Sequence, residues 1–491
     1  MELKNILSGL EGLKARGNLD ISISKVESDS SKVQKDDMFI AIDGFEQDGH
    51  QFIQEAIQNG AKVIMAQEDK VTKEIVSSIP EEVTLILTSN TRHAIAICAC
   101  NYYQNPSKKL KLIGVTGTKG KTTTTFMIKS LLEKQGLKVG LIGTICTYIG
   151  ENKLADNSRT TPEALEIQEL LSQMVKEKCN VAVLEVSSQS LKLGRVDGCD
   201  FDIGVFTNFS KDHISVKEHP NMEDYFASKV KLFEMCKYGF INSDDIFANK
   251  LPALVNNCEF KTYGIDNPAN LLAKDITVTN TYVDFRVKLG DKNQRIKTGI
   301  PGRFSVYNSL AAISVALKFG VNSTNIEEAL LNIRVPGRSE LVDNNKGLTI
   351  MIDYAHSPES LENILSTVKK YTQEKLICVF GCGGDRDHGK RPIMGEIAGK
   401  IADYTIITSD NPRSEDPEEI IKQIEKGIKE TKGSYEVIVD RKEAIKKALE
   451  MAHKKDIVII AGKGHELTQE IKGKKYPFDE RVIVREIIEK K

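Results

Sequence analysis

The stretch Gly114-Val115-Thr116-Gly117-Thr118-Lys119-Gly120-Lys121-Thr122 decides how this chain is interpreted. It overlaps an apolar run, Leu110 to Val115, that predicts a buried strand, and it precedes a helical pattern from Thr123 to Lys134. A strand, a glycine-rich turn and a helix N-terminus present backbone N–H groups and the positive end of the helix dipole to an anion. We therefore predict a phosphate-binding loop, although Val115 stands where the strict Walker pattern has its first glycine.

Side chains in and near this loop have the chemistry that a phosphate site requires. Lys121 is the candidate that neutralises phosphate oxygens, and Thr122 offers a hydroxyl where Mg²⁺ would bind. Glu185 follows the strand candidate Val181 to Leu184, and a carboxylate beside a phosphate loop can hold Mg²⁺ directly or through water. His213 follows another strand candidate and is a second candidate ligand. The alternatives are a capping or salt-bridge role for Glu185 and a structural role for His213.

Composition excludes several classes of protein. The 491 residues include 68 Lys and Arg against 69 Asp and Glu, a net charge of -1, so no basic excess indicates a nucleic-acid partner. The polar start, Met1 to Ser8, does not resemble a signal peptide, and no run reaches the ~18 apolar residues of a membrane span. The nine cysteines lack zinc-ligand spacing. We expect a cytoplasmic protein with reduced thiols and no membrane insertion.

The order of apolar runs and helical patterns predicts three α/β domains, at residues 1–107, 108–334 and 335–491. The second region has the rhythm of a parallel sheet, with strand candidates at 110–115, 138–142, 181–186 and 203–207. Residues 270–297 alternate as antiparallel strands do. The third region has strand candidates at 348–353, 375–380, 403–408 and 456–460.

Each strand candidate of the third region is followed by a polar or glycine-rich loop: 353–356, 381–387, 409–413 and 462–466. Ligands of open parallel sheets bind at the carboxyl ends of the strands, so four such loops predict one shared site. Arg386 and Arg413 offer the forked guanidinium that binds a carboxylate on two points. With Asp410 and Glu466 nearby they could hold a zwitterion; the alternative is surface salt bridges.

Seven landmarks in a fixed order resemble the Mur ligase family, the ATP-dependent amide-bond enzymes of peptidoglycan synthesis. They are Thr116–Thr124, Thr160-Thr161-Pro162, Glu185–Ser188, Thr207-Asn208 with Asp212-His213, Pro336-Gly337-Arg338, Asp353–His356 and Gly462–Glu466. The resemblance covers nearly the whole chain. It implies a monomeric three-domain α/β fold: a UDP-sugar-binding N-terminal domain, a central P-loop ATPase-like parallel sheet and a Rossmann-like C-terminal domain.

Within the family, the chain is most similar to members that add the third amino acid to UDP-MurNAc-L-Ala-D-Glu. By analogy, ATP phosphorylates the D-glutamate carboxylate, and the incoming amine attacks the acyl phosphate. The loop Asp410-Asn411-Pro412-Arg413 resembles that of members that add meso-diaminopimelate. L-lysine or another diamino acid, such as lanthionine, stays open as the alternative.

The resemblance also implies which residues form each subsite. Lys229 matches a lysine carried as an N-carbamate (an N-carboxylated lysine), which joins Thr122, Glu185 and His213 around Mg²⁺; Lys121, Lys229 and His213 are the implied catalytic set. The implied ATP contacts are Gly117, Thr118, Lys119, Gly120, Lys121, Thr122, Thr123, Asn308, Arg338 and Asp353. The implied UDP-sugar contacts are Ser28, Ser30, Phe45, Glu46, Gln47, Thr160, Thr161, Ser187 and Arg195. The implied amino-acid contacts are Arg386, Asp410, Asn411, Pro412, Arg413, Gly462 and Glu466.

Three departures from the family pattern accompany the match. Lys119 stands where many members have asparagine, and Asp29-Ser30-Ser31 has serine where arginine is common. The segment Ile214–Pro220 replaces the commoner Leu-Asp-Tyr-His-Gly. Two other functions compete with the ligase: a related folylpolyglutamate synthetase, and a nucleotide-binding switch without amide synthesis. The Asp410–Arg413 loop disfavours the first, and the set Lys229, His213 and Arg386 disfavours the second.

Overall fold

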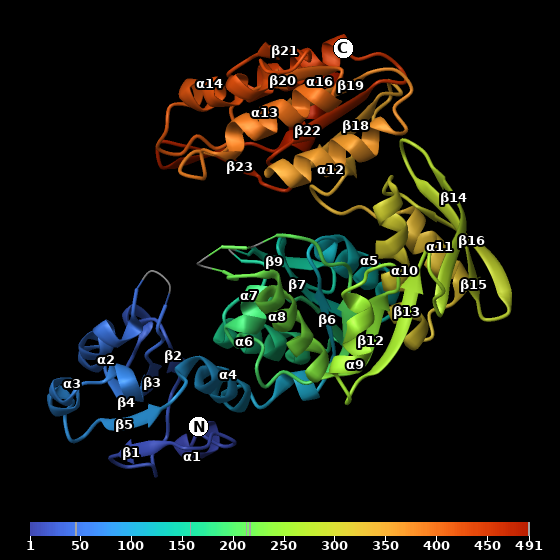
Figure 1. Ribbon diagram of the computed structural model, residues 1–491. Coiled ribbons are helices and arrows are strands. Elements are labelled where there is room, and N and C mark those ends of the chain that lie inside the picture. The colour runs from blue at the N-terminus through green and yellow to red at the C-terminus, as the bar shows by residue number, and fades with distance from the viewer. Residues whose placement is uncertain (45–46, 158, 213, 216–217, 490–491) are drawn as a thin grey trace. The chain divides into compact units, whose positions relative to one another are not determined.

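The computed structural model describes residues 1–44, 47–157, 159–212, 214–215 and 218–489. Contacts divide the chain into two compact units. The first comprises Met1–Asn270 and Ser314–Phe319, and the second comprises Leu271–Ile313 and Gly320–Lys491. Each unit is described by itself below, with the labels of Figure 1.

The N-terminal part of the first unit is a five-stranded sheet in the order β1-β5-β4-β3-β2, parallel except for the β1–β5 pair. Its strands are β1 (Lys14–Arg16), β2 (Val26–Glu27), β3 (Asp37–Ile40), β4 (Ala61–Gln67) and β5 (Thr84–Thr88). Its helices are α1 (Leu3–Ile6), α2 (Ile53–Gln58), α3 (Lys73–Ser78) and α4 (Thr91–Tyr102). One apolar cluster covers each face of the sheet, since successive side chains of a strand point to opposite faces.

The remainder of the first unit is a larger sheet in the order β13-β12-β11-β6-β10-β7-β8-β9. Its strands are β6 (Lys111–Thr116), β7 (Val139–Ile142), β8 (Cys146–Ile149), β9 (Asn152–Asp156), β10 (Val181–Glu185), β11 (Phe201–Phe206), β12 (Cys236–Asn242) and β13 (Glu259–Gly264). Its helices are α5 (Lys121–Lys134), α6 (Ala164–Lys176), α7 (Ser188–Lys192), α8 (Met222–Glu234) and α9 (Leu251–Leu254). The neighbouring strands in the part β13-β12-β11-β6-β10-β7 are parallel, as the sequence predicted. The pairs β7–β8 and β8–β9 are antiparallel.

The second unit begins with three antiparallel strands, β14 (Leu271–Val278), β15 (Val283–Leu289) and β16 (Lys292–Thr298), which confirm the alternation read at residues 270–297. Helix α10 (Arg303–Lys318) runs from this unit into the first, and α11 (Ser323–Leu331) follows it. The antiparallel pairing follows from the short turns between these strands, because parallel neighbours need a long crossover.

The C-terminal sheet of the second unit has the order β17-β18-β22-β19-β20-β21 and is parallel except for β17. Its strands are β17 (Glu340–Leu341), β18 (Thr349–Asp353), β19 (Leu376–Phe380), β20 (Tyr404–Ile407), β21 (Ser434–Val437) and β22 (Ile457–Ala461). A separate hairpin joins β23 (Thr468–Ile471) and β24 (Lys474–Pro477). The helices of the C-terminal sheet domain are α12 (Pro358–Lys369), α13 (Lys390–Ile401), α14 (Pro417–Ile428), α15 (Arg441–Met451) and α16 (Glu480–Glu489).

Helices cover both faces of this C-terminal sheet (Figure 1). In β19, Cys378 and Phe380 face the apolar cluster formed with α12, α13 and α14. The alternate residues Ile377 and Val379 face the cluster formed with α15 and α16. Because both faces of the strand are buried, its sequence is continuously apolar, as expected for a parallel strand. The resulting doubly wound sheet leaves its carboxyl edge for loops and ligands.

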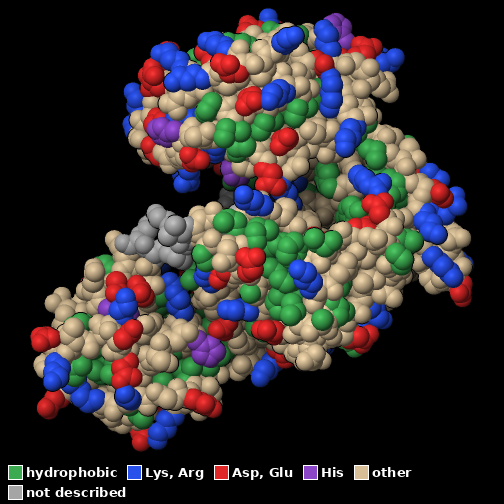
Figure 2. All heavy atoms as spheres, viewed as in Figure 1, with side chains coloured by type: hydrophobic (Ala, Val, Ile, Leu, Met, Phe, Trp, Pro, Cys, Tyr) green, Lys and Arg blue, Asp and Glu red, His purple; other side chains and the backbone are tan. Residues whose placement is uncertain are grey.

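The surface agrees with the balanced composition. On the face drawn in Figure 2, side chains of both charges are interspersed over the C-terminal sheet domain. No helix in the described ranges is long and apolar enough to cross a membrane. All nine cysteines are free, and eight of them are buried.

Candidate active site

The glycine-rich loop between β6 and α5 has a backbone that requires glycine. Gly117 adopts φ 141° and Gly120 adopts φ 83°, and a Cβ on Gly117 would lie 2.0 Å from the hydroxyl oxygen of Thr207. The predicted pair Thr207-Asn208, after neighbouring strand β11, holds the loop from outside. The N–H of Lys119 donates to Asn208 Oδ1 at 2.9 Å, and the Thr207 hydroxyl donates to the carbonyl of Lys119 at 2.6 Å. The left-handed Gly120 precedes α5, which begins two residues earlier than the sequence predicted.

Two lysines meet at this loop. Lys121 Nζ donates to the carbonyls of Gly117 and Thr118, both at 2.9 Å, and Lys229 Nζ on α8 donates to the same Gly117 carbonyl at 2.9 Å. Lys229 is 1% exposed and its Nζ lies 4.6 Å from the ring centre of Tyr225. Burial, followed by the charge of Lys121, lowers the pKa of Lys229 well below its usual value, although Asp212 opposes the shift. A lowered pKa supplies the neutral amine that carbamate formation needs.

Glu185, at the end of β10, lies beside the same loop and is fully buried. Its Oε2 accepts from the Thr122 hydroxyl and from the Thr144 hydroxyl, each at 3.0 Å, and its Oε1 accepts from the Thr144 N–H at 2.9 Å. A carboxylate held beside the loop hydroxyl is the donor pair that Mg²⁺ prefers, so these residues fit that ion. The described residues contain no cluster of three or more His, Cys, Asp or Glu that could hold a metal, and His213 lies outside them.

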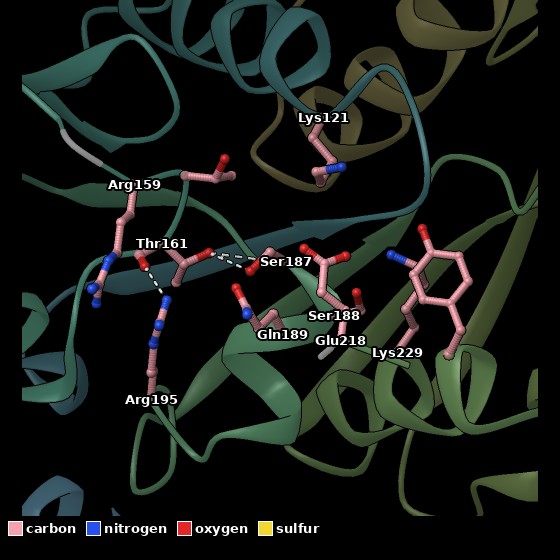
Figure 3. Close-up of a pocket in the computed structure, with 11 residues that line it drawn as sticks. Lys121, Arg159, Thr161, Ser187, Ser188, Gln189, Arg195, Glu218 and Lys229 are labelled. Carbon is pink, nitrogen blue, oxygen red and sulfur yellow. Dashed lines mark hydrogen bonds between the residues drawn. The ribbon is translucent and has the colours of Figure 1, made fainter. Parts of the chain in front are cut away.

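A cavity of about 300 Å³ opens beside the loop (Figure 3). It brings together residues that the sequence placed in two different subsites: Lys121 and Lys229 from the phosphate set, and Thr160, Thr161, Ser187 and Arg195 from the UDP-sugar set. The sequence did not indicate its other lining residues, Arg159, Ser188, Gln189, Glu218 and Tyr225. The cavity therefore joins the candidate phosphate loop to residues predicted to contact the UDP-sugar.

Hydrogen bonds fix the wall of this cavity. The Thr161 hydroxyl accepts from the N–H of Ser187 at 3.0 Å and donates to the carbonyl of Glu185 at 2.8 Å. Arg195 donates to the Thr161 carbonyl at 3.1 Å and pairs with Glu163 at 3.0 Å. Burial lowers the pKa of Arg195, and the charge of Glu163 opposes this shift. The arginine is therefore a fixed cation in the cavity wall.

Of the other UDP-sugar candidates, the three that the structure describes, Ser28, Ser30 and Gln47, belong to the N-terminal sheet domain and are not among the residues that line this cavity. Ser30 is buried and its hydroxyl donates to Glu55 Oε2 at 2.7 Å. Ser28 is partly exposed, and Gln47 is exposed. Phe45 and Glu46 fall outside the described residues.

A second candidate site was predicted at the carboxyl edge of the C-terminal sheet. The four loops predicted to share it follow β18, β19, β20 and β22, which pair in the order β18-β22-β19-β20. The Arg413 guanidinium donates to the carbonyl of Gly384 at 2.6 Å and lies 3.6 Å from Glu470. Arg413 adopts a left-handed φ of 50°, a conformation that costs a non-glycine residue on the order of 1 kcal/mol. Arg386 is exposed on the neighbouring loop.

Three buried cations form ion pairs near these loops that the sequence did not reveal. The Arg391 guanidinium binds both oxygens of Glu415 at 2.8 Å, which lowers the pKa of Glu415 to about 2. Fully buried Arg441 donates to Glu480 at 2.7 Å and to the carbonyl of Ala461 at 2.7 Å. A third pair joins the buried Lys463 to Glu466 at 2.9 Å.

The nucleotide candidates Asn308, Arg338 and Asp353 all belong to the second unit. Asn308 is buried on α10, and Asp353 ends β18. Asp353 accepts from the N–H groups of Ser339 at 2.7 Å and Ala355 at 2.9 Å. Burial raises its pKa, and the charge of Arg338 opposes that shift.

A phosphate loop beside a buried carboxylate, on a parallel sheet with helices, is typical of nucleotide-dependent α/β enzymes. Comparison with known proteins narrows this class. The Mur ligase family catalytic domain matches residues 22–103, the Mur ligase middle domain matches residues 115–316, and the Mur ligase glutamate ligase domain matches residues 337–464.

Relatives match along the whole chain. The UDP-N-acetylmuramoyl-L-alanyl-D-glutamate--2,6-diaminopimelate ligase of Caldanaerobacter subterraneus is 48% identical, with 99% of each chain covered. The protein of the same name from Clostridium botulinum is 44% identical, again with 99% of each covered. A solved structure of a ligase of that name superposes with a TM-score of 0.72 at 30% identity, covering 100% of this chain and 99% of the other.

The chain belongs to the Mur ligase family, whose members are ATP-dependent amide-bond ligases. The predicted α/β class and the three-domain Mur ligase architecture are confirmed. The domain boundaries at residues 107 and 334, and the roles of individual site residues, stay predictions.

Proposed function

We propose that this chain is the ATP-dependent ligase that adds meso-diaminopimelate to UDP-MurNAc-L-Ala-D-Glu in peptidoglycan precursor synthesis. The observation that carries the proposal is full-length similarity to ligases named for that reaction, up to 48% identical, in a chain that keeps the phosphate loop and the charged strand-end loops. The same comparisons favour diaminopimelate over L-lysine.

The chemistry follows the acyl-phosphate route. The γ-phosphoryl group of ATP passes to the D-glutamate carboxylate, giving an acyl phosphate and ADP. The amine of the incoming amino acid attacks the acyl carbon, and the tetrahedral intermediate expels phosphate as the nitrogen loses a proton. The protein forms no covalent bond to the substrate in such transfers, so positioning and charge stabilisation supply most of the rate acceleration.

We assign the ATP phosphates to the loop Gly117–Thr123, with Lys121 offsetting charge on the β and γ groups. Asn308, Arg338 and Asp353 are assigned to adenine and ribose. Thr122, Glu185, His213 and a carbamate on Lys229 would hold Mg²⁺, which offsets phosphate charge when bound. The buried position and lowered pKa of Lys229 support the carbamate, because the amine must be neutral to react with carbon dioxide.

The UDP-sugar substrate is assigned to the cavity residues Thr160, Thr161, Ser187 and Arg195 together with Ser28, Ser30, Phe45, Glu46 and Gln47. The fixed cation of Arg195 suits an anionic, carboxylate-bearing substrate. The amino acid is assigned to Arg386, Asp410, Asn411, Pro412, Arg413, Gly462 and Glu466. Three domains bounded near residues 107 and 334, and a monomeric cytoplasmic enzyme, complete the proposal.

Phosphate release by the purified enzyme tests this function. Release should require ATP, UDP-MurNAc-dipeptide and meso-diaminopimelate together, and each omission should reduce it to background. Release with folate and glutamate instead would indicate a folylpolyglutamate synthetase. Release from ATP that no amino acid stimulates would indicate a nucleotide-binding switch and would refute the ligase.

A further inference from the structure

We propose that Lys463 is a positioning residue that sets the charge balance of the amino-acid site and thereby favours a side chain ending in both an ammonium and a carboxylate. This inference rests on the proposed function and deepens it. Lys463 follows β22, between Gly462 and Glu466, and no local sequence pattern singles it out. Its side chain is fully buried.

The Lys463 ammonium joins two of the residues assigned to the amino acid. Its Nζ donates to Asn411 Oδ1 at 2.9 Å and to Glu466 Oε2 at 2.9 Å. Asn411 follows β20 and Lys463 follows β22, and β19 lies between these strands in the sheet. The lysine therefore connects loops that are not on adjacent strands.

The same contacts fix how Asn411 is turned. An ammonium has donors and no acceptor, so it must face the amide oxygen of Asn411. The backbone N–H of Glu470 also donates to that oxygen, at 3.0 Å. The amide NH₂ is left pointing at Glu466, and Nδ2 donates to Glu466 Oε2 at 2.7 Å. Glu466 is thus held by Lys463 and Asn411 together.

Exposure separates the two ends of this arrangement. The Lys463 side chain is 0% exposed, whereas the Glu466 side chain is 30% exposed. Lys463 therefore holds the Glu466 carboxylate from its buried side, and the exposed side of the carboxylate can contact a ligand. A buried ammonium is screened by water less than a surface one, so its charge acts strongly on nearby groups.

Other ionisable side chains near the proposed amino-acid site belong to the loops that follow the neighbouring strands. Asp410, on the same loop as Asn411, is mostly buried and lies 3.9 Å from Arg441. Arg413 lies beside Glu470 at 3.6 Å, and Arg386 is exposed on the loop after β19. Tyr354 lies close enough to Glu466 for that carboxylate to raise its pKa further, after burial, the main cause of the shift.

The electrostatic consequence has a definite sign. The far end of meso-diaminopimelate carries an ammonium and a carboxylate and is neutral overall, whereas L-lysine ends in an ammonium alone. Removing the positive charge of Lys463 weakens attraction for the distal carboxylate and leaves Glu466 more negative. Both changes disfavour diaminopimelate relative to lysine. A purely structural role for Lys463 would instead reduce the use of both amino acids by a similar factor.

The test compares kcat/KM for meso-diaminopimelate and L-lysine in the full-length enzyme and in Lys463→Met. We expect the preference for diaminopimelate to fall at least tenfold, on the order of what one nearby charge contributes at a partly buried site. The loss should appear in the KM for diaminopimelate and leave the KM values for ATP and the UDP-sugar unchanged. Lys463→Arg, which keeps a cation, should restore part of the preference.

Lys422→Met is the matched control. Lys422 also pairs with a glutamate three positions away, Glu419 at 2.6 Å, but both side chains are about 60% exposed. The control should leave the preference unchanged. If Lys463→Met does not fold, as measured by its thermal transition, Lys463→Gln keeps a hydrogen-bond donor without charge and should show the same shift.

An unchanged ratio of the two kcat/KM values in Lys463→Met or Lys463→Gln, with both rates lowered alike, would overturn this inference. The proposed function would survive that result, because the parent enzyme would still add diaminopimelate. A parent enzyme that adds neither amino acid would refute the proposed function and this inference with it.

Discussion

The phosphate-loop site and the proposed amino-acid site differ in the groups that their basic side chains contact. At the loop, the side-chain nitrogens of Lys121 and Lys229 both donate to the backbone carbonyl of Gly117. At the C-terminal edge, the buried cations pair with carboxylates: Lys463 with Glu466, Arg391 with Glu415, and Arg441 with Glu480. The Lys121 cation, held on backbone carbonyls, is stabilised when an anion binds, whereas cations already paired with carboxylates favour a ligand that is neutral overall, such as a zwitterion. We therefore expect the phosphate-loop site to be completed by its ligand and the proposed amino-acid site to be assembled before its ligand binds.

The largest effect is expected from removing the lysine of the phosphate-loop site. Lys121→Ala should lower ATP turnover on the order of a hundred- to a thousandfold, the usual cost of removing a group that stabilises transition-state charge. The fold should be intact, because the Lys121 ammonium donates to the carbonyls of its own loop, Gly117 and Thr118. Steady-state phosphate release measures the loss, and Lys134→Ala, at the exposed end of the same helix, is the control. Turnover near that of the parent enzyme would remove Lys121 from the phosphate site.

The next effect concerns Lys229. Lys229→Ala should lose on the order of a hundredfold in activity, and added acetate or formate should restore part of it by supplying the missing carboxylate. Because the pKa of Lys229 is lowered, the neutral amine is present at a pH below that of an ordinary lysine, so bicarbonate should activate the enzyme at neutral pH.

Mass measurement without acid treatment checks this directly, because acid removes a carbamate. We expect the native enzyme to carry one added carbon dioxide. A free amine on Lys229 in active, bicarbonate-supplied enzyme would contradict the proposed carbamate.

A smaller effect is expected at the proposed amino-acid site, on the preference between two amino acids. Arg413→Ala should reduce kcat/KM for meso-diaminopimelate about ten- to a hundredfold more than for L-lysine. The reason is that lost charge-assisted hydrogen bonds cost about 1.5–3 kcal/mol each. Paired kinetics with the two amino acids give the ratio. Equal losses would mean that Arg413 supports the loop, through the Gly384 carbonyl, and does not bind the distal carboxylate.

The smallest effect is on stability. Arg391 lowers the pKa of Glu415 from its ordinary value of 4.5 to about 2, so the stabilisation is present above pH 4.5 and is lost as the pH falls through 2. Glu415→Gln should cost about 2 kcal/mol in the free energy of unfolding at neutral pH, discounted for partial exposure. The difference from the parent enzyme should vanish near pH 2. Denaturant unfolding measures it, with exposed Glu419→Gln as the control, and a constant difference across this range would contradict the account.

Sequence predicted one site better than the other for a physical reason. The phosphate loop depends on residues adjacent in the chain, so its glycines, Lys121 and Thr122 were visible as a pattern. The strand-end loops were visible too, because buried parallel strands are continuously apolar and end in polar residues. Lys229 entered only through resemblance, since a helical lysine gives no local signal. The ion pairs Arg391–Glu415 and Arg441–Glu480 join residues 24 and 39 positions apart, and no local pattern marks such partners.

The central claim is that a phosphate-loop site and a pre-assembled amino-acid site together make a diaminopimelate-adding ligase. The most direct measurement gives the purified enzyme ATP, UDP-MurNAc-L-Ala-D-Glu and equal concentrations of meso-diaminopimelate and L-lysine, and identifies the nucleotide product by mass. We predict the diaminopimelate-containing tripeptide in at least tenfold excess over the lysine-containing one, since about 1.4 kcal/mol of selective binding gives a tenfold preference. A product mixture in which the lysine-containing tripeptide equals or exceeds the diaminopimelate-containing one would contradict the account.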